Sequence, residues 1–157
     1  MTVHDTAWYR ETLAYVERRH HGKTDKLGRP YYEHFTRVVD RLLDHAPHAT
    51  PAQVQAALLH DALEPDGVTA EELRRQGVEE SAIRIIQRIT LPTDGRDYMQ
   101  YIEELVAHGD RAALEVKLAD NADAVSTYTE NPTLPGAELL EARFIPARKM
   151  LKDALAR

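Results

Sequence analysis

Apolar side chains recur at helical spacing in several separate stretches of this chain. The clearest stripe predicts a helix over residues 32–46 and consists of Phe35, Val38, Val39, Leu42 and Leu43. Similar spacing predicts helices over residues 6–20, 79–90, 97–108, 110–128 and 136–156. No segment has the apolar–polar alternation of a strand. We therefore expect an all-α fold, an orthogonal bundle of about seven to eight helices, and not a coiled coil, because no heptad is sustained.

One further helix is predicted over residues 51–63, where the residues are mostly Ala, Leu, Val and Gln. Thr50 is a suitable N-cap for it, and Pro51 suits its first position. The apolar composition places this helix near the centre of the bundle. Pro65 should end it, since proline disfavours helical geometry at the residue before it. Thr69 and Glu72 have capping-box spacing, which predicts a short helix over residues 69–76.

The composition is typical of a globular protein. Apolar residues make up 43% and charged residues 29% of the 157 residues, so we expect one domain over residues 1–157. The apolar runs are too short to cross a bilayer, so no membrane association is expected. The first residues lack a basic region followed by an apolar stretch, which predicts no signal peptide and a cytoplasmic location.

The absence of cysteine and the negative charge narrow the chemistry. With no cysteine, a disulfide framework, a thiolate nucleophile and a cysteine metal site are all excluded. A metal must then be held by His, Asp, Glu or neutral oxygen ligands. The formal net charge is −6 and no long Lys/Arg cluster is present, so binding to nucleic acid is disfavoured.

Residues of metal-ligand type occur at three informative places, namely at His34, at the adjacent His60 and Asp61, and at Asp120. His60 and Asp61 lie in the predicted central helix, where Leu58 and Leu59 precede them and Ala62 and Leu63 follow. An unpaired carboxylate in a core costs several kcal/mol, and a divalent cation would satisfy both side chains. Each residue also has an ordinary alternative. Asp61 could form a helix cap or pair with an arginine, and His60 could be half exposed. Asp120 could pair with Lys117, and His34 could pack or lie on the surface.

The order of these residues, together with their neighbours, resembles the HD superfamily of phosphohydrolases. More narrowly, it is similar to the hydrolase domain of the RelA/SpoT-type (p)ppGpp hydrolases and their small stand-alone relatives. The ordered match covers roughly residues 14–123. Its matching residues are His20, His21, Gly22, Lys26, Gly28, Pro30, Tyr31 and His34, then QAALLHDALE over residues 55–64, and VKLAD over residues 116–120.

The resemblance implies a mononuclear metal centre. In this family the first His, the His-Asp pair and the distal Asp hold one divalent ion, often Mn²⁺, with Fe, Co, Ni and Zn as alternatives. Carried over, the metal ligands are His34, His60, Asp61 and Asp120. The metal would activate water and neutralise phosphoryl charge, so the implied reaction is hydrolysis of a phosphate ester or anhydride in a small molecule. A (p)ppGpp-like nucleotide is the implied substrate, and the resemblance leaves a homo-oligomer open.

The resemblance also implies roles for residues around the metal. The family places an acidic pair just after the His-Asp motif, and its first member corresponds to Glu64, which we expect to act with Asp61 in catalysis as a water-orienting base. On a continuous helix Glu64 would share a face with Asp61, held at the cleft rim by Pro65. Lys23 and Lys26 are the expected substrate-binding residues, with a solvated basic loop as the alternative.

This chain departs from the (p)ppGpp hydrolase pattern at three positions. Pro65 stands where relatives carry the second acid, and Asp66 follows one position later. Asp25 stands where relatives carry an arginine before Lys26. Ala124 stands where relatives usually carry an asparagine. These departures leave a second interpretation open, a non-catalytic HD-fold module that senses a nucleotide or binds a protein. For His20 we favour a structural role.

Overall fold

The computed structural model describes residues 2–157, and within them the chain is helical without a β-strand. Over these residues eight α-helices are present, so the predicted all-α bundle is confirmed. The element bounds are η1 Val3–Asp5, α1 Ala7–Arg19, α2 Glu33–His45, α3 Pro51–Leu58, α4 Ala70–Arg75, α5 Glu80–Ile89, α6 Tyr98–His108, α7 Arg111–Glu130, the π-helical turn η2 Leu140–Phe144, and α8 Ile145–Leu155. No helix in this part of the chain is long and apolar enough to cross a membrane.

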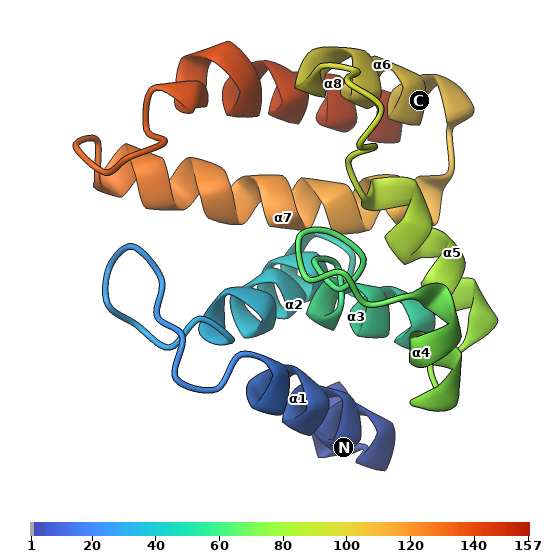
Figure 1. Cartoon of the computed structure of the whole chain (residues 1–157). Coiled ribbons are helices and arrows are strands. Elements are labelled where there is room, and N and C mark those ends of the chain that lie inside the picture. Colours follow the sequence, from blue (N-terminus) through green and yellow to red (C-terminus); the bar gives the residue numbers. More distant parts are fainter. Residues whose placement is uncertain (1) are drawn as a thin grey trace.

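The long helix α7 runs through the middle of the molecule, with α2 and α3 on one side and α6 and α8 on the other (Figure 1). Its own contacts with α2, α3, α5 and α8 join the two sides. Most of the apolar stripe predicted on α2 is buried there: Phe35, Val38, Val39 and Leu42 are at most 1% exposed, and Leu43 is partly buried. Burial of this kind stabilises by about 25 cal/mol per Å² of apolar surface. One apolar core therefore fixes α2 against α7, the two helices that carry most of the site.

Helix starts in this chain are capped by side chains that the sequence identified. The Thr50 hydroxyl accepts a hydrogen bond from the Gln53 backbone N–H, and Pro51 occupies the first turn of α3. Thr69 accepts in the same way from the Glu72 N–H at the start of α4. Such caps satisfy backbone donors that the first turn of a helix leaves without an intrahelical acceptor.

The predicted end of the central helix was wrong. Helix α3 ends at Leu58, and residues 59–66 form successive turns. The physical reason lies in His60, whose Nδ1 is 2.8 Å from the Ala57 carbonyl oxygen. In a continuing helix that carbonyl would accept from the N–H of Asp61. The side chain thus replaces the next helical hydrogen bond, and the His-Asp pair lies on a turn that follows the helix.

The last helix also begins later than predicted. The expectation was a helix over residues 136–156, whereas α8 starts at Ile145 and is preceded by the π-helical turn η2. The Asn121 side-chain amide donates to the Phe144 carbonyl oxygen at 2.9 Å, which ties this turn to α7. The irregular segment therefore brings Phe144 against the same stretch of α7 that carries Asp120.

Candidate metal centre and its pocket

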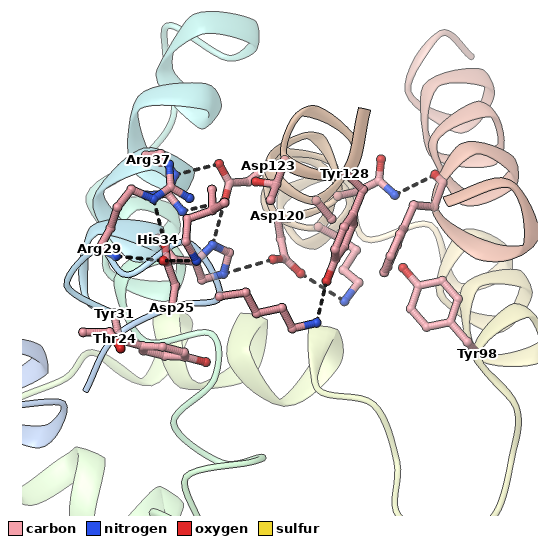
Figure 2. A pocket seen from close by; sticks show the side chains of 17 residues that line it. Thr24, Asp25, Arg29, Tyr31, His34, Arg37, Tyr98, Asp120, Asp123 and Tyr128 are labelled. Carbon is pink, nitrogen blue, oxygen red and sulfur yellow. Dashed lines mark hydrogen bonds and ion pairs between the residues drawn. The ribbon is translucent and has the colours of Figure 1, made fainter. Parts of the chain in front are cut away.

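Four side chains that can ligate a metal converge where α2, α7 and the turn after α3 meet, and Figure 2 shows two of them, His34 and Asp120, side by side. His34 Nε2 and His60 Nε2 are 3.2 Å apart. Asp120 Oδ1 lies 3.2 Å from His60 Nε2 and 3.6 Å from His34 Nε2. Asp61 Oδ1 lies 3.4 Å from His60 Nε2. His34, His60 and Asp61 form a group that could hold one ion, and Asp120 Oδ1 lies beside both of its imidazoles.

The outer nitrogens of both imidazoles are already engaged. His34 Nδ1 lies 2.8 Å from Asp123 Oδ2, and His60 Nδ1 lies 2.8 Å from the Ala57 carbonyl oxygen. These acceptors assign a proton to each Nδ1, which turns the lone pair of each Nε2 toward the other imidazole. Two lone pairs facing each other at that separation repel unless a positive charge, either a proton or a metal ion, lies between them. Metal-binding histidines are held by the same kind of outer hydrogen bond, so this donor set fits a divalent ion.

The carboxylates of Asp61 and Asp120 make the space between the two imidazoles strongly attractive to positive charge. Burial alone would lower the pKa of His60, but the charges of Asp61 and Asp120 outweigh it and raise that pKa to about 9. Burial alone would raise the pKa of Asp120, yet His60 and Lys117 hold it far below its usual range. Asp120 is therefore an anion at neutral pH. A divalent cation would take the place of the His60 proton, as metal binding to histidine generally requires.

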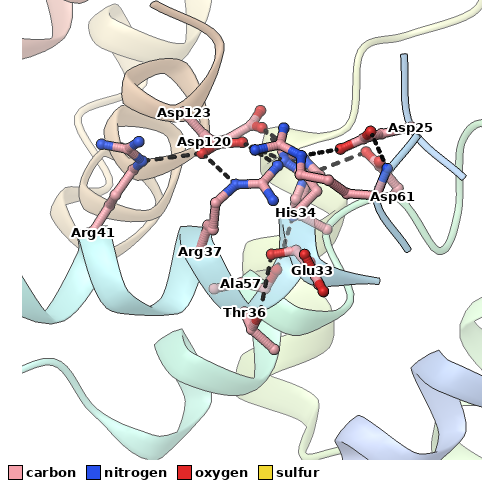
Figure 3. A network of polar contacts seen from close by, with 12 residues as sticks. Asp25, Glu33, His34, Thr36, Arg37, Arg41, Ala57, Asp61, Asp120 and Asp123 are labelled. Atoms are coloured by element: carbon pink, nitrogen blue, oxygen red, sulfur yellow. Dashed lines mark hydrogen bonds and ion pairs between the residues drawn. The ribbon is translucent and has the colours of Figure 1, made fainter. Parts of the chain in front are cut away.

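Asp123 holds His34 in place through the imidazole nitrogen that faces away from the other candidate ligands. The sequence analysis did not predict this role. Its carboxylate is 3% exposed and contacts His34 Nδ1, Arg37 Nε at 3.0 Å and Arg41 Nε at 3.1 Å (Figure 3). Burial alone would raise its pKa, but hydrogen bonds from His34 and Arg37 lower it well below the usual range. A signal was present in the sequence, because His34, Arg37 and Arg41 follow helical spacing and therefore share one face of α2.

A pocket of about 380 Å³ is lined by His34 and Asp120, two of the four converging side chains (Figure 2). One wall is the loop that includes Asp25, Lys26 and Arg29, and the opposite wall is the C-terminal half of α7. The far end is aromatic, where the rings of Tyr128 and Phe144 stack with centroids 5.8 Å apart. The pocket therefore combines a metal-type donor set, charged side chains and flat apolar surfaces within one cavity.

Comparison with known proteins places the chain in a family. A zebrafish (Danio rerio) protein, guanosine-3′,5′-bis(diphosphate) 3′-pyrophosphohydrolase MESH1, is 35% identical over 127 residues, which cover 76% of this chain and 68% of that protein. This chain belongs to the HD-domain phosphohydrolases related to the (p)ppGpp hydrolases. The predicted family is thereby confirmed, and the chain is an enzyme of the phosphohydrolase class.

Two other comparisons bear on the fold. A solved structure, described as a metazoan orthologue of SpoT that hydrolyses ppGpp, matches with a TM-score of 0.77 at 21% identity, over 98% of this chain and 88% of that one. That likeness confirms the HD-domain fold. A comparison with models of known protein families finds no match. HD-domain phosphohydrolases use divalent metals, and this chain supplies a His-His-Asp group able to hold one.

Of the other residues expected at the site of this HD-domain phosphohydrolase, Lys26 lines the pocket, whereas Lys23 and Glu64 do not. Lys26 lines the pocket, where its Nζ donates to the Tyr128 hydroxyl at 3.0 Å and to the Pro135 carbonyl oxygen at 2.5 Å. Lys23 is exposed on the same loop but does not line this pocket. Glu64 is exposed on the turn after Asp61, not on a helix, so the helical reason for placing it beside Asp61 was wrong.

His20 lies beneath the turn that carries Asp61. Its ring is 4% exposed and stacks on Tyr31 with centroids 5.0 Å apart, and its Nε2 lies 2.9 Å from Asp66 Oδ2. The Asp66 backbone N–H in turn donates to the Asp61 carbonyl oxygen at 3.2 Å. His20 thus anchors the end of the turn on which Asp61 lies, which agrees with the structural role expected for it.

Proposed function

We propose that this chain hydrolyses a phosphate ester or anhydride of a nucleotide at a single divalent metal ion. The observation that carries the proposal is the convergence of His34 Nε2 and His60 Nε2 at 3.2 Å, with Asp120 Oδ1 3.2 Å from the second imidazole. Asp61 is the fourth ligand of the proposed set. Because relatives of this chain are hydrolases, the non-catalytic HD-fold module is the weaker alternative.

Mn²⁺ is the ion we propose for the site. Two imidazole nitrogens and two carboxylates form a borderline-to-hard donor set that suits Mn²⁺, and Fe, Co, Ni or Zn are compatible with the same donors. A divalent ion there supplies Lewis-acid charge toward water and a phosphoryl oxygen. The protein's own contribution is to fix the donors, since Asp123 orients His34 and the Ala57 carbonyl orients His60.

The remaining residues are proposed to position the substrate and the attacking water. Glu64 follows Asp61 on the exposed turn, and we assign it the role of orienting water and accepting its proton. Lys26 faces the pocket from the loop and is proposed to contact a phosphate or ribose oxygen. For Lys23, a contact with the substrate at the pocket rim is the corresponding proposal.

The substrate class rests on the relative and on the pocket together. MESH1 is named for cleaving the 3′-pyrophosphate of guanosine 3′,5′-bis(diphosphate). In this chain Tyr98, Tyr128 and Phe144 line the pocket, and flat rings are suited to contact a nucleobase. We therefore propose a nucleotide whose phosphoryl group lies at the metal and whose base lies toward these rings. The enzyme acts on a small phosphorylated molecule, with neither a nucleic acid nor a membrane as its proposed partner.

The experiment combines metal analysis with a substrate panel. Protein purified without chelator should contain close to one equivalent of a divalent metal, and chelated protein should regain activity with Mn²⁺. Nucleoside mono-, di-, tri- and tetraphosphates should include at least one substrate whose turnover is lost in Asp61→Ala. Less than about a tenth of an equivalent of metal, with no nucleotide hydrolysed after Mn²⁺ addition, contradicts the proposal. Saturable nucleotide binding without turnover would favour the sensing module.

A further inference from the structure

Two cations that line the pocket are balanced by a neighbouring carboxylate inside the protein. Arg29 Nε lies 2.9 Å from Asp25 Oδ2, and Asp25 also accepts hydrogen bonds from two backbone N–H groups of the loop. Lys117 Nζ lies 3.5 Å from Asp120 Oδ2. Each pair joins one positive charge to one negative charge. Neither Arg29 nor Lys117 therefore brings a net positive charge to the pocket.

Arg37 lines the same pocket, and its charge is not balanced in this way. Arg37 Nε lies 3.0 Å from Asp123 Oδ1, and Arg37 Nη2 lies 3.2 Å from Asp123 Oδ2. Arg41 Nε lies 3.1 Å from the same Asp123 Oδ1, so two guanidinium groups share one carboxylate. Over residues 2–157, neither arginine has a second carboxylate within ion-pair distance, and Arg37 Nη1 makes no hydrogen bond. One positive charge of this cluster is therefore left uncompensated.

Arg37 and Arg41 are one helical turn apart on α2, but they line different cavities. The partly exposed side chain of Arg37 lines the pocket beside the proposed metal centre. Arg41 lines a separate groove between α2, α7 and α8 and does not line this pocket. The two guanidinium groups reach the Asp123 carboxylate from different directions (Figure 3). A ligand in the metal pocket can therefore meet Arg37 but not Arg41.

The Asp123 carboxylate also places Arg37 next to a proposed metal ligand. Asp123 Oδ2 lies 2.8 Å from His34 Nδ1 and 3.2 Å from Arg37 Nη2. His34 Nε2, on the other edge of the imidazole, faces His60. The guanidinium and the metal position thus lie toward opposite edges of one ring, and both His34 and Arg37 line the pocket. A diphosphate group, with oxygens on two phosphorus atoms, spans such a separation better than a single phosphoryl group.

We propose that Arg37 binds a phosphate oxygen of the substrate and favours substrates that present a diphosphate group to the metal. The inference rests on the proposed function, because it takes one phosphoryl group to be held at the metal. Asp123 fixes Nε and Nη2, so the guanidinium is oriented before a ligand arrives and Nη1 is free to donate. A guanidinium held in this way suits a phosphate, because its planar donors match phosphate oxygens.

The first test measures binding to intact, chelated protein and needs no turnover. The probe is methylenediphosphonate, a diphosphate analogue that cannot be hydrolysed, and isothermal titration calorimetry gives its affinity. Arg37→Gln removes the positive charge and keeps a donor toward Asp123. It should weaken the binding of methylenediphosphonate about 10- to 100-fold, as expected for a lost hydrogen bond between charged groups. Parental affinity in Arg37→Gln would overturn the inference.

The second test uses the Mn²⁺-loaded enzyme with guanosine 3′,5′-bis(diphosphate). Arg37→Gln should raise the KM for this nucleotide about 10- to 100-fold and change kcat less than about threefold, because binding is lost equally in the ground and transition states. Inorganic phosphate occupies only the metal position, so its inhibition constant should change less than about threefold. An equal loss for phosphate and for the nucleotide would contradict the preference for a diphosphate group.

Arg41→Gln is the matched control, because it removes the other cation from the same carboxylate. It should change the affinity for methylenediphosphonate less than about threefold. Equal effects of Arg37→Gln and Arg41→Gln would mean that Arg37 only neutralises Asp123, which overturns the inference. Arg37→Lys keeps the charge without the fork of donors and should recover part of the affinity. If Arg37→Gln does not fold, Arg37→Lys and Arg41→Lys provide the same comparison, with the larger loss expected for Arg37→Lys.

The two tests separate failure of this inference from failure of the proposed function. If no nucleotide is hydrolysed but Arg37→Gln alone loses methylenediphosphonate binding, the proposed reaction fails and Arg37 remains a phosphate-binding residue. If a nucleotide is hydrolysed and Arg37→Gln has the parental KM, the proposed function stands and the role of Arg37 is lost.

Discussion

His34 and Asp123 are 89 positions apart in the chain, yet His34 Nδ1 and Asp123 Oδ2 lie 2.8 Å from each other in the protein. This contact joins α2 to α7 and fixes which nitrogen of His34 faces the metal centre. The same carboxylate accepts hydrogen bonds from Arg37 and Arg41. One buried anion therefore neutralises cations on α2 and also orients the imidazole of His34. Structural support and ligand orientation are therefore carried by one residue.

Asp123→Asn should weaken metal binding more than it weakens the fold. Asparagine keeps the shape and one acceptor oxygen, but it loses the charge that holds the imidazole, and such outer partners are worth about 10- to 100-fold in metal affinity. Competition with a metal-binding dye measures the affinity. Asp44→Asn, at an exposed position on α2, is the charge-matched control. Parental affinity in Asp123→Asn would show that His34 needs no orienting partner.

Lys117→Met should destabilise the metal-free protein more than the metal-loaded one. Lys117 is 10% exposed in its side chain and lies 3.5 Å from Asp120, whose charge it partly neutralises. Without metal, the free energy of unfolding should fall by about 1–3 kcal/mol. This is less than the full cost of breaking a buried pair, because His60 still faces Asp120. A bound divalent cation supplies that positive charge, so the loss should shrink.

Urea unfolding with and without chelator measures this difference, and Lys149→Met is its control. Lys149 lies on the surface of α8 with a side chain that is 77% exposed, and its pair with Asp153 is a surface ion pair. Surface pairs contribute little, about 0–1 kcal/mol. An equal loss for Lys117→Met in both metal states would mean that Lys117 acts by packing against Tyr98 and Tyr101, not by charge.

The sequence predicted the helices well because their periodicity and caps are local properties. The stripe on α2 and the Thr50 cap depend on residues within a few positions of one another, and both are present. The end of α3 could not be predicted, because the stop comes from the His60 side chain occupying the Ala57 carbonyl. Helical propensity in the segment after Leu58 is favourable, so composition alone indicated a longer helix.

The four candidate metal ligands could be predicted, because their order in the sequence matches a known pattern. The role of Asp123 could not, because it depends on a contact between residues far apart in the chain. His34, His60, Asp61 and Asp120 were named from a pattern that specifies their identity, and the structure brings them together. The burial of Asp123 depends on α2 packing against α7, which no local spacing specifies. A pair of charged residues one turn apart on α7 is ordinarily a solvated surface, so the shared face of His34, Arg37 and Arg41 on α2 was the one local signal for Asp123, and it did not specify burial.

His20 should make the protein more sensitive to mild acid. Burial lowers the pKa of His20 below its ordinary value of 6.5, which outweighs the attraction of Asp66. The buried Nδ1 has no hydrogen-bond partner among the described residues, so protonating it would leave a buried donor unsatisfied. Because the folded pKa is the lower one, the unfolded state binds more protons just below pH 6.5. Stability from neutral His20 is therefore present above that pH and is lost as the pH falls.

The measurement is the free energy of unfolding of the chelated protein at several pH values between about 5 and 7.5. His20→Gln keeps a donor toward Asp66 and cannot titrate, so its stability should fall less on acidification than that of the parent. His108→Gln, at an exposed position on α6, should follow the parental curve. If the free energy of unfolding depends on pH in the same way for His20→Gln and the parent, His20 has the same pKa in the folded and unfolded chains.

Glu64 and Asp66 offer two candidates for the residue that orients the attacking water. Glu64 is exposed on the turn after Asp61, and over residues 2–157 no hydrogen bond or ion pair engages its carboxylate. Asp66 is engaged by His20 at 2.9 Å, and its side chain is 13% exposed. An unengaged carboxylate on the turn that follows Asp61 is better suited to accept a proton from water than one already holding an imidazole.

Glu64→Gln should therefore slow turnover of the best nucleotide by about 10²–10⁴-fold while metal content stays at the parental value. Glutamine keeps the size of the side chain and removes only its ability to accept a proton. Glu103→Gln, on the exposed face of α6, is the matched control and should retain the parental rate. Single-turnover kinetics with saturating Mn²⁺ separate the chemical step from metal loss. If Glu64→Gln reacts at the parental rate and Asp66→Asn does not, the base is Asp66, and its pairing with His20 becomes part of the catalytic arrangement, since that imidazole would then set the position of the carboxylate.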